Sequence, residues 1–238
     1  MIEQYLPNYS VTYLLHIIIS LFSIFGYIRL KKAYNEKKIS SLKNFAMFFL
    51  LFGIFLFSMG LPMLIPVELS PVKLGGFFIF GHVLLYAALV YFIQVPFSLS
   101  FPKYRKYAVW FNIAMGTIIT YTNLIYWNEP TIEGSITLMH VTGPVGPMIG
   151  VLNIINLLLF GTFYFGYMAI QNRGTERWKY SLLSLAFLLI TVGGPLHDNA
   201  TGLTQYLIAD ALIFLALATL FAGIYVKSIL HPRSTKDR

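Results

Sequence analysis

Seven apolar runs constrain this chain more than any other feature of its sequence. A transmembrane helix needs about 20 mostly apolar residues. The runs predict spans at Thr12–Leu30, Phe45–Ile65, Leu74–Pro96, Ala108–Trp127, Val145–Ile170, Ser181–Pro195 and Tyr206–Val226. Only 11% of the 238 residues are charged, whereas soluble domains carry about 25%. We therefore expect an all-α, polytopic membrane protein with one seven-helix domain over residues 1–228 and a short basic cytoplasmic tail at 229–238.

The basic residues predict the orientation of these spans. Sixteen of the 17 Lys and Arg residues lie at the inner end of the first span or follow the first, third, fifth and seventh spans, and Lys73 alone lies on the other side. Because basic loops stay in the cytoplasm, we expect the N-terminus outside and the C-terminus inside. The formal net charge of +8 then reflects orientation and contact with anionic lipid, so we expect no nucleic-acid partner. The plasma membrane is the expected location.

One acidic residue lies inside a predicted span and therefore points to a polar site within the bundle. Asp210 lies well inside the seventh span, and no Lys or Arg lies inside any span except Arg29, next to the inner end of the first. A bare carboxylate in hydrocarbon is costly, so Asp210 requires protonation, water or a partner. The available cationic or metal-mediated partners are histidines. Four of the five fall in the outer half of the predicted bundle, namely His16, His82, His140 and His197.

Backbone breaks accompany two of these histidines. His140 opens a Gly- and Pro-rich run, and Gly193-Gly194-Pro195 is expected to end the short sixth span and place His197 in a loop. Irregular backbone at membrane depth is tolerated where it lines a cavity. The ordinary alternative is that these residues only end helices at loops.

We predict a site in the outer leaflet, assembled from several spans. Its predicted metal or cofactor ligands are His16, His82, His140, His197 and Asp210, with Asp198, Tyr86 and Tyr206 as neighbours that orient them. The predicted polar lining of the cavity is Ser20, Asn123, Asn153 and Asn156. Imidazole binds copper, zinc and iron, and a histidine pair can ligate haem. The chain has no cysteine, which excludes thiolate sites and iron–sulfur clusters.

The pattern is not specific enough to decide among three functions. No paired-histidine motif places two ligands on one helix, and each polar side chain can instead join helices by hydrogen bonding. The leading hypothesis is a metal- or haem-binding protein for redox chemistry or electron transfer. The alternatives are a non-catalytic accessory subunit of a larger membrane complex, and a small-molecule or proton-linked sensor or carrier. Replacing Asp210 by Asn is expected to leave an accessory subunit unaffected and to impair the other two.

Overall fold

Seven helices in the described part of the chain are long and apolar enough to cross a membrane, which confirms the main prediction. The computed structural model describes residues 6–61, 71–126, 131–133, 136–138, 143–200 and 202–230. Six spans are the helices α1 (Leu6–Lys37), α2 (Ser40–Gly60), α3 (Pro71–Ser100), α4 (Arg105–Ile125), α7 (Gly174–Asp198) and α8 (Leu203–Leu230). The fifth combines α5 (Val145–Asn153), the π-helical segment η3 (Ile154–Phe163) and α6 (Tyr164–Gln171).

Short elements complete the fold. The predicted ends of two spans fall outside the residues that the structure describes. A single 3₁₀ turn, η2 (Pro102–Tyr104), precedes α4. The strands β1 (Thr131–Glu133) and β2 (Ile136–Leu138) pair antiparallel between α4 and α5, a hairpin that the sequence did not predict. The predicted ends of the second and fourth spans, Ile65 and Trp127, lie outside the described residues, as do positions 231–238 of the predicted tail.

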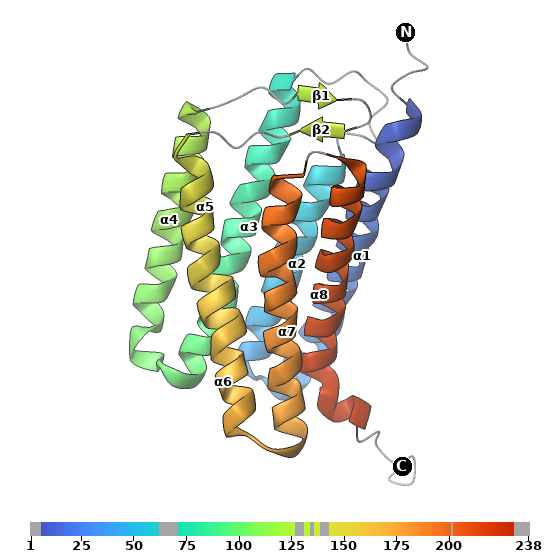
Figure 1. The fold of residues 1–238 in the computed structure, drawn as a ribbon. Helices are drawn as coiled ribbons and strands as arrows, with labels where there is room; N and C mark the ends of the chain where they lie inside the picture. The colour runs from blue at the N-terminus through green and yellow to red at the C-terminus, as the bar shows by residue number, and fades with distance from the viewer. Residues whose placement is uncertain are drawn as a thin grey trace.

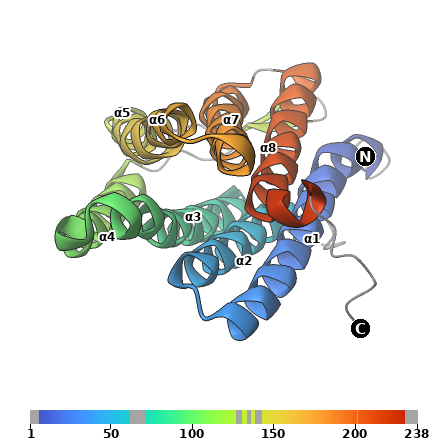
Figure 2. The same ribbon diagram turned by 90° about the horizontal axis from the view of Figure 1, so that it is seen from below.

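The helices form two rows that follow the order of the chain (Figures 1 and 2). One row runs from α1 through α2 and α3 to α4, and the other runs from α5 and α6 through α7 to α8. Contacts of α8 with α1, and of α5 with α4, join the rows at their edges. Because consecutive spans alternate in direction, α1 begins and α8 ends at opposite ends of the bundle (Figure 1).

Phenylalanine rings join the two rows at the centre of the bundle. The Phe187 ring on α7 lies 4.2 Å from the Phe92 ring on α3 and 6.4 Å from the Phe48 ring on α2. Phe165 stacks on Phe187 at 5.9 Å, and all four side chains are buried. Packing and interhelical hydrogen bonds, rather than escape from water, hold helices together in lipid. These ring contacts are therefore a main source of cohesion between the rows.

Two serines join α1 to α2. Ser20 donates a hydrogen bond of 2.7 Å to the carbonyl of Gly53, and Ser23 donates one of 2.6 Å to the carbonyl of Phe49. Both serines are fully buried. The structure thus places Ser20, a predicted cavity residue, in a helix–helix contact, where small polar residues let backbones approach closely.

The predicted break at the end of the sixth span is wrong. Helix α7 continues through Gly193 and Pro195 to Asp198. Gly193 lies in close contact with α8, since a Cβ atom added there would lie 3.3 Å from the carbonyl oxygen of Ala209. The Pro195 carbonyl accepts a bond of 3.1 Å from the backbone N–H of Asn199, just beyond the helix end. His197 therefore extends from the last turn of a helix rather than from a loop.

Candidate metal centre

Three predicted ligands from three different helices meet at one point. Oδ1 of Asp210 on α8 lies 3.2 Å from Nε2 of His16 on α1 and 3.8 Å from Nε2 of His197 on α7. One potential ligand atom from each residue lies within 4.8 Å of the other two. We call these three residues the His–Asp cluster. Sequence separations of 13 and 181 residues show that only the closure of the bundle brings them together.

The cluster is buried, but one of its members remains accessible. His16 and Asp210 are 3% and 1% exposed, whereas the side chain of His197 is 18% exposed. A carboxylate removed from water is stable only when its environment compensates for the lost hydration. The nearest groups able to provide that compensation are the two imidazole Nε2 atoms that lie near one carboxylate oxygen. His197 marks the accessible side of the cluster.

Ring contacts and helix periodicity position these side chains. The imidazole rings of His16 and His197 lie 5.1 Å apart in an edge-on arrangement. The Tyr206 ring stands perpendicular to the His197 ring at 4.9 Å. Tyr206 precedes Asp210 by four residues on α8, so the two share one face of the helix. Tyr206, one of the predicted neighbours, therefore lies beside His197, and its role in orienting a ligand stays a prediction.

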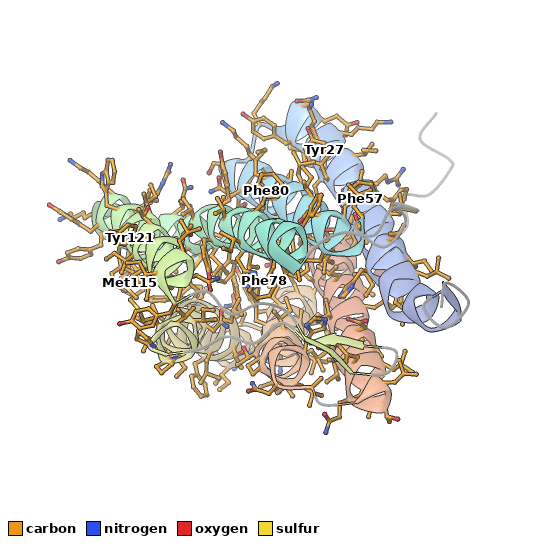
Figure 3. All side chains as sticks on the ribbon, turned by 90° about the horizontal axis from the view of Figure 1, so that it is seen from above. Tyr27, Phe57, Phe78, Phe80, Met115 and Tyr121 are labelled. Atoms are coloured by element: carbon orange, nitrogen blue, oxygen red, sulfur yellow. The ribbon has the colours of Figure 1, made fainter. Side chains whose placement is uncertain are left out.

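The cluster lies at the end of the bundle that carries the hairpin. Helix α7 ends and α8 begins at this end, and strands β1 and β2 lie across it (Figure 1). Seen from above in Figure 3, the hairpin lies over α7 and α8. The described basic residues of the α1–α2, α3–α4 and α6–α7 connections lie at the opposite end. The cluster and the basic residues of these connections thus lie at opposite ends of the bundle.

His82 lies in a different environment. Its Nδ1 atom is 2.9 Å from the carbonyl oxygen of Phe78, one turn earlier on α3. Its ring contacts those of Phe55, Phe78 and Tyr86, with centroid distances of 5.7, 4.1 and 6.1 Å. The group of described residues that converges for a metal ion contains His16, His197 and Asp210, without His82. Tyr86, another predicted neighbour, therefore accompanies His82 rather than the cluster.

The remaining predicted residues are dispersed or lie outside the description. His140 and the side chain of Asp198 are not among the described parts of the chain. Asn123 is buried on α4, and Asn153 is half-buried at the end of α5. Asn156 is fully buried in η3, where its Nδ2 donates to the carbonyl of Leu152 at 2.9 Å.

Donor chemistry and spacing suit a metal ion. Metal–nitrogen and metal–oxygen bonds of about 2.0–2.2 Å place neighbouring ligand atoms about 3.3 Å apart in a tetrahedral site. The 3.2 Å separation between His16 and Asp210 matches this value, and the 3.8 Å separation to His197 requires a shift of about half an ångström. Three protein ligands leave at least one position for water or substrate.

Comparison with known proteins assigns no family to this chain: no family model matches it, and no curated protein matches its sequence. Fold and site alone therefore define its class. It is a multi-pass helical membrane protein in which two histidines and one aspartate, two of the three buried, lie close enough together to hold a metal ion.

Proposed function

We propose that this protein is an integral membrane metalloprotein that binds one divalent first-row metal ion through His16, His197 and Asp210. We further propose that the ion serves redox chemistry or electron transfer. The convergence of both Nε2 atoms on Oδ1 of Asp210 supports the proposal most directly. It accounts for a costly carboxylate inside a transmembrane span.

The donor set favours iron or copper for the redox role and admits zinc. Two imidazoles and one carboxylate with open positions form the ligand set of many non-haem iron centres, and similar sets bind catalytic zinc. The partial exposure of His197 gives a small reactant an approach to such an open position.

Haem is less well supported than a metal ion. Axial histidines approach haem iron from opposite faces of a planar macrocycle. The two Nε2 atoms here face one carboxylate oxygen instead, and the two rings lie 5.1 Å apart. That arrangement suits a compact ion, so we restrict the proposal to one.

We also propose that the cluster lies in the outer leaflet of the plasma membrane. The distribution of basic residues supports this orientation, because cytoplasmic loops are enriched in Lys and Arg. Exposed apolar side chains along the spans, such as Ile18, Phe25 and Phe214, are compatible with lipid contact.

Elemental analysis of the purified protein tests the proposal. We expect about one equivalent of iron, copper or zinc after metal loading and removal of excess ion. Asp210→Asn and His197→Gln are expected to lower the metal content at least tenfold, because each removes a ligand. His82→Gln is the matched control, since it removes a buried imidazole outside the cluster and is expected to retain the metal.

Three results would contradict all or part of the proposal. A wild-type protein that stays metal-free after incubation with Fe²⁺, Cu²⁺ and Zn²⁺ would exclude the metal centre and leave the accessory-subunit and sensor or carrier hypotheses. Equal loss of metal from His82→Gln would show that the loss reflects misfolding. Exclusive binding of zinc would retain the metal centre but reject the redox role, because zinc has no redox chemistry.

A further inference from the structure

A groove between α3 and α4 is a second candidate site, formed by residues that are not part of the His–Asp cluster. Its volume is about 470 Å³. Its apolar lining includes Val83, Ala87 and Val90 on α3, and Ile113, Gly116 and Leu124 on α4. Val83, Ile113 and Leu124 are exposed at its edges. Because both helices are membrane spans, the groove opens sideways toward lipid.

One buried polar atom in the groove wall lacks a hydrogen bond. Asn112 lines the groove and is only 2% exposed. Its Nδ2 donates to the carbonyl of Ala108 at 2.9 Å, which fixes the orientation of the amide because the flipped amide would place two oxygens together. Among the described residues, its Oδ1 atom has no hydrogen-bond partner. A buried acceptor left in this state is costly, so a donor from a ligand would be favourable here.

Two threonines reinforce this preference for a donor. Thr117 and Thr120 line the same groove and donate their hydroxyl hydrogens to the carbonyls of Ile113 and Gly116, each at 2.8 Å. Their oxygens therefore remain available only as acceptors. Helix α4 thus carries three acceptor oxygens along an apolar wall, while the tyrosine hydroxyls of the lining can donate or accept. Oδ1 of Asn112 lies just beneath the surface of that wall, so a ligand hydroxyl reaches it by displacing a lining side chain.

We propose that this groove binds an apolar alcohol that enters from the bilayer and donates its hydroxyl hydrogen to Oδ1 of Asn112. The volume lies within the range of about 300–1,000 Å³ found for small-molecule sites. A mostly apolar lining with a few polar groups is typical of such sites. Gly116 keeps the helices close at the base of the groove, since an added Cβ would lie 2.9 Å from Cβ of Tyr86.

Photolabelling in reconstituted lipid vesicles tests this proposal. The probes are a long-chain alcohol with a diazirine in its alkyl chain, a fused-ring alcohol with the same group, and the methyl ether of each. The ethers match the alcohols in shape but lack the hydroxyl hydrogen. We expect at least one alcohol to label α3 and α4 about five- to tenfold more than its ether, and the preferred skeleton identifies the kind of alcohol.

Matched variants assign the effect to the groove. Asn112→Leu is expected to reduce labelling by the alcohol to the level of the ether. Thr117→Phe is expected to fill the groove and abolish labelling of these helices by both. Gln94→Leu is the control, because Gln94 on α3 also bonds a carbonyl four residues earlier but does not line the groove. It is expected to label as wild type does.

Equal labelling by alcohols and ethers in the wild type would overturn the proposal, and the groove would then be an ordinary lipid contact. Full labelling of Asn112→Leu by the alcohol would also overturn it. Absence of labelling, together with cross-links between the α4 helices of two copies, would assign the groove to self-association instead. Metal content is expected to be normal in every groove variant, which separates this test from that of the metal centre.

Discussion

Asp210 is the residue whose contacts we expect to matter most for the stability of the bundle. Its carboxylate is 1% exposed inside a membrane span and faces His16 at 3.2 Å. Removing the partner of a buried polar group costs about 1–3 kcal/mol, and more when the group is charged, because the group is left without an interaction that replaces water. We predict that His16→Leu lowers the free energy of unfolding of the metal-free protein by about 3 kcal/mol. Adding Asp210→Leu is expected to recover part of that loss.

Unfolding of the two single variants and the double variant in detergent, with a chelator present, measures this coupling. A double variant less stable than His16→Leu would contradict the prediction, because it would show that Asp210 stabilises the bundle without its histidine partner.

At this scale, the sequence predicted candidate ligands but not which of them lie together in the structure. A carboxylate in an apolar run requires a partner, and that rule, together with depth in the membrane, placed His16 and His197 among four candidate histidines. The same rule included His82, because a position along a helix predicts depth in the membrane but not location around the bundle. The carbonyl of Phe78 beside His82 is a local partner that no sequence pattern reveals.

At the scale of the element, the fifth span departs most from its prediction. The sequence predicted one continuous helix over Val145–Ile170, whereas Ile154–Phe163 is π-helical. Thr162 donates to the carbonyl of Leu157, five residues earlier, and Ser184 on α7 donates to the carbonyl of Thr162 at 2.8 Å. Hydropathy is a property of the residues and not of the helix type, so the apolar run does not distinguish an α-helix from a π-helix.

Glycines in this span give a matched test of its packing. A Cβ added at Gly161 would lie 2.6 Å from Cβ of Phe187, whereas one added at Gly150 would meet no atom within 4 Å. Because overpacking costs about 1–3 kcal/mol, we predict that Gly161→Ala lowers the free energy of unfolding by about 2 kcal/mol. Gly150→Ala is expected to be neutral or to stabilise by up to about 1 kcal/mol, since Ala favours helix. Detergent unfolding of both variants measures the difference, and equal values would show that η3 does not pack tightly on α7.

At the scale of the whole molecule, the seven spans were predictable because apolar length is a local property of the chain. The arrangement of the helices in two joined rows, and the hairpin, were not predictable, because they depend on contacts between distant segments such as α1 and α8. The basic residues of the connections gather at one end of the bundle and the His–Asp cluster lies near the other. The orientation of the protein in the membrane therefore determines from which side metal ions and reactants can reach the cluster.

The absence of cysteine from the chain makes that orientation directly testable. Thr204 is exposed at the start of α8, near the cluster, and Glu36 is exposed at the basic end of α1. We predict that a membrane-impermeant maleimide labels Thr204→Cys on intact cells, but labels Glu36→Cys only after permeabilisation. The reverse pattern would place the cluster on the cytoplasmic side and contradict the orientation expected from the basic residues. Labelling of neither variant before permeabilisation and of both after it would place the protein in an internal membrane. In either case the metal centre could still exist, but its ions and reactants would come from a different compartment.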